Sequence, residues 1–471
     1  MRFRTISAGV FAALIFAALP IGAASAKTFT VPCDSNALVT AINNANLDTV
    51  KDTINLSAGC NYVLTAPASV DADGPDGLPV ITTPVNILGN GATISRSTDP
   101  ATVPFRILKV DTSGVLTTNN VILQNGLLED SPVSAGAGIL NRGSASLLST
   151  SLRNNNVVIN GGVAFPIGGA VANVQGATFS MTYGDVTGNS AQSPPCGCSP
   201  TVFGVPLGGG IANGGALSIN QTSIVGNEAV AEAFVAFAVG GGISSGGNPS
   251  ASLDVRGAKI LNNTVGTEGL TDAAIGGGIG ANTLTMTGTE VGNNSAEAFG
   301  LSSGTAVGGG IATFGTTSVA RSSNIHDNVA EVFARGGRAL GGGVANTADL
   351  SIVASTVTNN QAQGFGGADA YGGGIQTTGS LTLSSSTVTG NTASSANGEA
   401  LGGGIFNGPG ATATITSSAV TGNAASGGAF QAGGGIYNDA GPGAVTIPAS
   451  SVASNSPDNC APAGSVPGCI G

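Results

Sequence analysis

Four glutamates recur at similar places along the chain and are its strongest candidates for chemistry. Each lies three to five residues after a recurrent asparagine; they are Glu232, Glu268, Glu297 and Glu331. If successive repeats stack, their carboxylates form a ladder that could bind Ca²⁺, and paired carboxyls are also what a glycoside hydrolase requires. The preferred interpretation is that each glutamate faces solvent beside an inward aromatic or aliphatic residue, because this segment varies in length as loops do.

Other residues suited to catalysis are few. His326 is the single histidine; it follows an aliphatic position and is expected to point outward without a catalytic partner. The segment 71–77 (DADGPDG) is similar to a calcium loop, but Pro75 occupies a ligand position, and an Asp/Gly-rich turn explains it equally well. The basic residues are scattered, so the basic groove that an acidic polysaccharide needs is not expected.

Composition narrows the class of protein. The chain has 471 residues, of which 77 are glycine, with 41% hydrophobic and 8% charged residues and a net charge of −11. The hydrophobic content is sufficient for a core and argues against disorder, and the glycines lack the three-residue period of collagen. The acidic balance argues against nucleic acid as a partner.

The N-terminus has the pattern of a secretory signal peptide spanning residues 1–26. Arg2 and Arg4 precede the apolar run 8–19, and Ala24-Ser25-Ala26 fits a cleavage site. No later apolar run is long enough to predict a membrane span. We therefore expect a protein that is secreted or located at the cell surface.

The six cysteines fit an oxidising compartment. Two local pairs are predicted, Cys33 with Cys60 and Cys460 with Cys469. Cys196 and Cys198 flank one residue and could form a strained pair, remain free or bind a metal, which the sequence leaves open.

An internal repeat dominates the chain. A glycine cluster followed by Ile or Val recurs, most regularly at 30 to 33 residues, and ends at Ile211, Ile243, Ile279, Ile311, Val344, Ile375, Ile405 and Ile436. A second marker is an asparagine at positions 155, 189, 227, 263, 294, 328, 360, 391, 423 and 455. The positions three and eight residues before each asparagine are apolar, and the position five before it is mostly Ser or Thr.

These columns predict an all-β fold, a single-stranded right-handed parallel β-helix of about 13 coils. Alternating apolar residues indicate short strands with one buried face, the Ser/Thr position indicates a turn, and glycine permits a sharp bend before the Ile or Val. One coil cannot bury its apolar face alone, so the coils must stack. The aligned asparagines are then expected to form an amide ladder.

The same reasoning divides the mature chain into three parts. Residues 27–79 form an N-terminal cap with a helix over 36–46, N-capped by Asp34 or Ser35, and the Cys33–Cys60 loop. Residues 80–455 form the β-helix, with regular coils from about residue 136. Residues 456–471 form a C-terminal cap closed by the Cys460–Cys469 disulfide.

The motifs resemble those of polymorphic outer-membrane proteins. Gly168-Gly169-Ala170-Val171 is similar to their GGA[ILV] motif, and the aliphatic-x-x-Asn column is similar to their FxxN motif. The stretch 78–106 resembles secreted bacterial β-helix proteins of pectin-lyase-like fold, in which Arg96 and Arg106 would make structural bonds. The resemblance to polymorphic outer-membrane proteins implies a C-terminal translocator barrel, but the sequence pattern after the repeats does not predict barrel strands.

The resemblance implies a fold more than an activity, because this fold carries many functions. We expect a secreted, non-catalytic protein with an adhesive or structural role, whose partner is an extracellular surface or a glycan. The alternatives are a polysaccharide lyase or hydrolase that uses the glutamates, and a binding module stabilised by Ca²⁺. No other cofactor is predicted.

Overall fold

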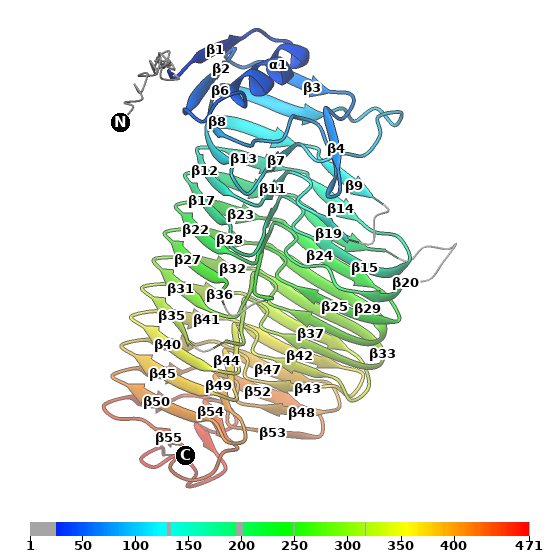
Figure 1. Ribbon diagram of the computed structural model, residues 1–471. Helices are drawn as coiled ribbons and strands as arrows, with labels where there is room; N and C mark the ends of the chain where they lie inside the picture. The colour runs from blue at the N-terminus through cyan, green and yellow to red at the C-terminus, as the bar shows by residue number, and fades with distance from the viewer. Residues whose placement is uncertain (1–24, 130–132, 195–200, 248–249, 316, 471) are drawn as a thin grey trace, which may run out of the picture.

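The computed structural model describes residues 25–129, 133–194, 201–247, 250–315 and 317–470. Strands account for 56% of the chain and helix for 3%, so the fold is all-β. Figure 1 shows the strands stacked in parallel into a β-solenoid, with the N-terminal cap at one end and the C-terminus at the other. The solenoid has about 12 turns, and the predicted parallel β-helix is confirmed.

One turn illustrates how the repeat folds. Its strands are β39 (Val344–Asn346), β40 (Asp349–Val353), β41 (Thr356–Thr358), β42 (Gln361–Phe365) and β43 (Asp369–Tyr371). β39 belongs to a 12-stranded sheet, β40 and β41 to a 25-stranded sheet, and β42 and β43 to an 18-stranded sheet. Each strand pairs in parallel with its equivalent in the next turn, as Leu350 does with Leu381. Equivalent residues therefore form columns along the axis.

The bends lie where the sequence predicts them. Ala354 (φ 47°) separates β40 from β41, and Asn359 (φ 55°) leads from the 25-stranded to the 18-stranded sheet. Ser355 is the Ser/Thr position, and its backbone N–H donates to the hydroxyl of Ser386 in the next turn at 3.1 Å. The hydroxyl column thus satisfies buried backbone groups at the predicted turn.

The regular spacing of the asparagines produces a buried amide ladder, as predicted. Asn360 Oδ1 accepts the backbone N–H of Asn328 at 3.0 Å and its side-chain amide at 2.9 Å, and Asn360 Nδ2 donates to Asn391 Oδ1 at 2.9 Å. The aliphatic residue three positions before each asparagine is buried in the core, as Val357 is. The ladder pairs buried polar groups that would otherwise destabilise the fold.

The early turns explain why the repeat count was too high. The segment 105–110 is too short to form a turn by itself. It contains β7 (Leu108–Val110), which belongs to the 12-stranded sheet, whereas β6 (Pro84–Arg96) and β8 (Val115–Gln124) belong to the 25-stranded sheet. β7 therefore completes the turn begun by β6.

The predicted N-terminal cap is a helix held by a disulfide. Helix α1 (Ser35–Ala45) is N-capped by Asp34, whose carboxylate accepts the N–H of Asn36 at 2.8 Å. Leu38 and Ile42 are fully buried, and the Cys33–Cys60 disulfide is formed. The helix covers the first turn and shields its strand edges. Among the described residues, no helix is long and apolar enough to cross a membrane.

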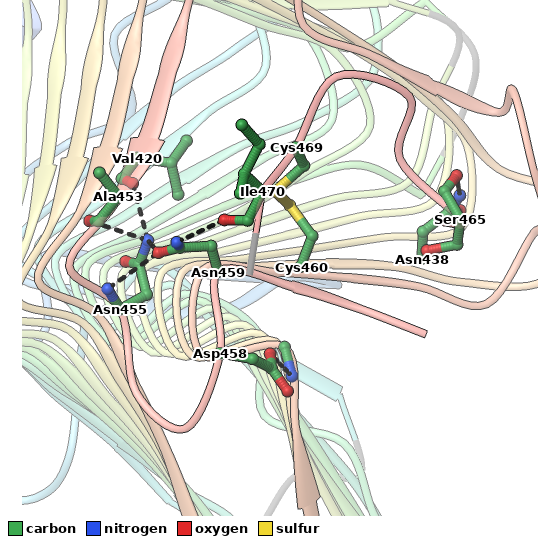
Figure 2. The surroundings of a disulfide bond; sticks show 11 residues. Val420, Asn438, Ala453, Asn455, Asp458, Asn459, Cys460, Ser465, Cys469 and Ile470 are labelled. Carbon is green, nitrogen blue, oxygen red and sulfur yellow. Dashed lines mark hydrogen bonds between the residues drawn. A yellow bond between two sulfur atoms is a disulfide. The ribbon is translucent and has the colours of Figure 1, made fainter. Parts of the chain in front are cut away.

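The C-terminal cap ends the asparagine ladder (Figure 2). Asn459 Oδ1 accepts the side-chain amide of Asn455 at 3.1 Å, and Asn459 Nδ2 donates to the carbonyl of Ile470 at 2.8 Å. The predicted Cys460–Cys469 disulfide joins the two sides of this loop. The last rung is thereby satisfied by the cap itself.

Candidate functional site

A groove of about 700 Å³ runs along the outside of the 12-stranded sheet in the N-terminal part of the solenoid. The strands beneath it are β11 (Ile139–Asn141), β16 (Val171–Asn173), β21 (Ile211–Asn213), β26 (Ile243–Ser245) and β30 (Ile279–Ala281). In each, the first residue points into the core and the middle residue faces outward. After Leu140 these middle residues are small, which leaves the surface hollow: Ala172, Ala212, Ser244 and Gly280.

One wall of the groove is a column of aliphatic side chains that stand just before the glycine turns. The column consists of Ile167, Leu207, Val239 and Ile275. Glycine is required in the turn that follows, because at Gly208 φ is +65° and a Cβ would lie 2.2 Å from the carbonyl oxygen of Ile211. The sharp bend brings the wall next to the floor.

A buried ion pair closes the N-terminal end of the groove, next to the hairpin of β4 (Ser69–Asp71) and β5 (Gly74–Asp76). The side chains of Arg106 and Asp76 bind each other and are fully buried. Burial raises the pKa of Asp76, although Arg106 opposes the shift. Arg106 also donates to backbone carbonyls, and so does Arg96, so the structural roles predicted for both are confirmed.

The remaining aspartates of the hairpin are also bound to cationic side chains. Asp73 binds Arg142 through both carboxylate oxygens and lies 2.7 Å from Lys109 Nζ, which also binds Asp71. Burial alone would raise the pKa of Asp73, but the hydrogen bonds from Arg142 and Lys109 hold it below its usual value. These contacts favour the second interpretation of segment 71–77, a structured turn, over a calcium loop.

The amides beside the groove are already paired. Asn173 Nδ2 donates to Asn213 Oδ1 at 2.7 Å, and Asn213 Nδ2 donates to Ser245 Oγ at 2.9 Å. These bonds form a second ladder beneath the floor. The amide groups of Asn173 and Asn213 are thus used in hydrogen bonds within the fold.

A different surface, on the 25-stranded sheet, carries a row of hydroxyl groups that we name the hydroxyl row. Asp254 and Val319 occupy the equivalent position in two turns, and the other members face outward with a hydroxyl: Ser146, Ser180, Ser218, Thr285, Ser351, Thr382, Thr414 and Thr446. A shallow depression of about 300 Å³ lies on the row beside Ser180, Ser218 and Asp254. The row is nearly uncharged along its length.

The four candidate glutamates do not form one ladder. Glu232 pairs with Glu268, and Glu297 pairs with Glu331, but Glu268 lies opposite Phe299. Glu232 and Glu268 stand five residues after their ladder asparagines, whereas the other two stand three residues after theirs. Because the ladder sets the register, the glutamates form two separate pairs on adjacent strands. The expected column of four is therefore wrong.

The two glutamate pairs raise the question of metal binding. Burial and the neighbouring carboxylate raise the pKa of Glu331, and the same effects raise that of Glu232. Over the described part of the chain, no group of three or more His, Cys, Asp and Glu side chains is placed to hold a metal ion. Binding of Ca²⁺ at Glu232, Glu268, Glu297 and Glu331 stays a prediction, with two carboxylates at each place.

The aromatic residues near these glutamates stack, but on the outside of the solenoid. Phe333 lies 4.7 Å from Phe299 and 4.6 Å from Phe365 between parallel rings. Phe299 is 40% exposed, while Ala298 beside it is fully buried. The expected inward orientation is wrong, because Phe299 is two residues from Glu297 and alternation places both on one face.

Three other sequence candidates have simpler outcomes. His326 is not among the groove residues; its Nδ1 lies 2.7 Å from Asp327 and its Nε2 lies 3.3 Å from Glu290. Carboxylates therefore hold it in place at the sheet surface. Cys196 and Cys198 lie outside the described residues, as does most of the predicted signal peptide.

A buried carboxyl group escaped the sequence analysis. Asp272 in β29 (Thr264–Ile275) is 3% exposed and lies between Ala236 and Gly304 of the adjacent turns. Neither of its oxygens makes a hydrogen bond of normal geometry. Burial raises its pKa to about 7, against weaker opposing effects of the Thr267 hydroxyl and the Phe299 N–H.

The groove was also missed. Its signal is present in the sequence, because the residue after each repeat Ile or Val is the outward floor residue. Comparing these outward residues along the chain would have revealed the run of small side chains that forms the floor of the groove. Comparison with protein-family models, with curated proteins and with solved structures found no match.

Proposed function

We propose that the protein is a secreted, non-catalytic β-solenoid with an adhesive or structural role outside the cell. The observation that carries this proposal is the hydroxyl row. Stacked hydroxyls repeat at the strand spacing of ~4.8 Å and offer both donors and acceptors. Such a surface suits a neutral glycan or another extracellular surface.

Two features support secretion. The pattern of residues 1–26 predicts a signal peptide, and the disulfides Cys33–Cys60 and Cys460–Cys469 persist in oxidising compartments. The GGA[ILV]-like and aliphatic-x-x-Asn motifs support placement among secreted bacterial β-helix proteins of pectin-lyase-like fold.

The groove supports the non-catalytic part of the proposal. Among its described lining residues, Asp73 is the one carboxylate, and it is held by Arg142 and Lys109. A general acid or base must exchange a proton with substrate, and a carboxylate fixed between two cations is poorly suited to do so.

The test combines binding and cleavage on the same polysaccharides. The mature protein is incubated with neutral and acidic polysaccharides, and retention and new chain ends are measured. We expect retention on a neutral glycan without new chain ends, and weaker retention for Ser218→Glu with Thr285→Glu. Ser394→Glu, on the 18-stranded sheet, is the matched control. New reducing ends or unsaturated sugars would contradict the proposal.

A polysaccharide hydrolase is the second candidate, and the Glu297–Glu331 pair favours it. The two residues are partners on adjacent strands, and the pKa of Glu331 is raised by burial and by Glu297. A separation of ~5 Å between carboxyls is typical of retaining glycosidases. In the same cleavage assay, activity lost in Glu297→Gln with Glu331→Gln would establish this candidate in place of the first.

A further inference from the structure

The chemistry of the groove lining indicates what the groove can hold. It crosses five successive turns, from Leu140 to Gly280, so four steps of ~4.8 Å make it about 19 Å long. From Ile167 to Ile275, the described lining contains no ionisable side chain. Its occupant is therefore long, narrow and apolar over most of its length.

The largely apolar lining argues against a sugar in this position. A pyranose buries hydroxyl groups that need partners. Here the amides of Asn173 and Asn213 are used in the ladder beneath the floor, and Arg106 is bound to Asp76 and to backbone carbonyls. The aliphatic column Ile167 to Ile275 faces the occupant instead.

The C-terminal turns reveal what fills the same position elsewhere in the chain. The floor column continues in register through Ala312 and Ala345 to Gln376, Phe406 and Tyr437. Phe406 is 6% exposed and stacks between Tyr371 and Tyr437. Over those turns the protein covers its floor with its own apolar rings, and over the groove an apolar ligand can take their place.

The N-terminal end of the groove is polar, and Arg142 is the exposed cation of its described lining. Arg142 uses Nε and Nη2 to bind Asp73, and its Nη1 has no partner among the described residues. Its side chain is 36% exposed, whereas those of Lys109 and Arg106 are buried. Nη1 of Arg142 is therefore available to donate to an anionic oxygen, and Lys109 shares the neutralisation of Asp73.

We infer that the groove binds a single extended aliphatic chain with a carboxylate head, the head at Arg142 and the tail directed toward Phe314. The ligand class is a free long-chain fatty acid. The hydrophobic effect supplies most of the affinity along the tail, and Arg142 sets the orientation. This inference goes beyond the proposed function and does not depend on it.

Palmitate is the probe, titrated calorimetrically into the mature protein with both disulfides intact. We expect one binding site per chain. Ala212→Phe should weaken binding by roughly tenfold or more, because a ring at the floor fills the groove as Phe406 does in its own turn. Arg142→Gln should weaken palmitate binding by roughly tenfold and leave hexadecanol unaffected; Arg256→Gln, an exposed arginine of the 25-stranded sheet, is the matched control.

Folding of each variant is checked by its melting temperature, and Ser244→Leu replaces Ala212→Phe if that variant fails to fold. The inference is overturned if the wild-type protein does not bind palmitate or if the filled-groove variant binds it unchanged. Equal loss of palmitate and hexadecanol in Arg142→Gln would overturn the role of the head group. If cellohexaose binds and Ala212→Phe blocks its binding, the ligand is a glycan and not a fatty acid. If the protein binds only to phosphatidylcholine vesicles, the ligand is a lipid surface and not a free fatty acid. None of these outcomes alters the cleavage test of the proposed function.

Discussion

Two stretches of the 12-stranded sheet differ in the size of their outward-facing side chains. In β16, β21, β26 and β30 the outward residue is small and the surface is a groove. In β44 (Ile375–Thr377), β49 (Ile405–Asn407) and β54 (Ile436–Asn438) the equivalent residue is large and the surface is covered. The strands pair in the same register in both stretches, so the difference lies in the side chains and not in the backbone.

The covered stretch is built as a small outer core. Tyr371, Phe406 and Tyr437 stack at 4.8 Å and 5.7 Å, and the Tyr371 hydroxyl lies 3.0 Å from Asp369 and from Glu399. Burial and these carboxylates raise the pKa of Tyr371, so it stays protonated and donates. The same backbone therefore accepts either small or large outward side chains on this sheet. A few residues decide whether the surface is open or covered.

The largest effect is expected from removing the central ring of the covered stretch. Phe406→Ala should lower the free energy of unfolding by about 3–5 kcal/mol, because it leaves a cavity between two tyrosines. Ala212→Phe in the groove stretch should change it by only about 1 kcal/mol, because the added ring would lie in the open groove and not in a packed core. Chemical denaturation of both variants measures the contrast; equal losses would show that the two stretches do not differ in this way.

A pH effect is expected from the groove stretch, where β29 supplies both Ile275 and the buried Asp272. The folded state holds the proton of Asp272 up to a pKa of about 7, while the unfolded chain releases it near about 4. Stability from this group is therefore complete below pH ~4 and is lost as the pH rises through 7. We expect a decline of about 2–4 kcal/mol over this window. Asp272→Asn should flatten the profile in denaturation at several pH values, and an unchanged decline would locate the effect in another group.

The smallest effect should be the same in both stretches. Asn227 lies in the ladder at the groove stretch and Asn423 in the ladder at the covered stretch, and each accepts two hydrogen bonds from the preceding asparagine. Replacing either by alanine leaves two buried donors without their acceptor and should cost about 1–3 kcal/mol per variant. Thermal unfolding should give similar losses. A marked difference would mean that the two stretches also differ inside the core.

Much of the fold was predictable because its signals are local and repeated. The aliphatic positions before each asparagine, the Ser/Thr turn and the glycine bend all follow from side-chain alternation and backbone sterics. The helix beginning near Asp34 and the two disulfide pairs were predictable for the same reason, since each depends on a short stretch of chain. The count of turns was less secure, because β7 lacks the repeat markers and completes a turn that another strand begins.

The candidate site was predicted less well. The glutamates were grouped because each lies three to five residues after an asparagine, but the asparagine ladder sets the register, and a difference of two residues separates Glu268 from Glu297. The predicted inward orientation of Phe299 was wrong for a related reason. Phe299 is two residues after Glu297, so alternation along the strand places both side chains on the same face. The groove was not anticipated, since no single one of its residues has distinctive chemistry.

The amino-acid sequence by itself determined the period, the buried face of each strand and the ladder of amides, because these depend on spacing along one turn. Only the tertiary structure decided which carboxylates are neighbours, which cations neutralise the aspartates of the hairpin, and where the outer surface is hollow. These features depend on contacts between residues roughly 30 or more positions apart, and the lengths of the bends set those contacts. A groove exists where several turns in succession place small side chains on one face, which becomes visible only when the turns are stacked.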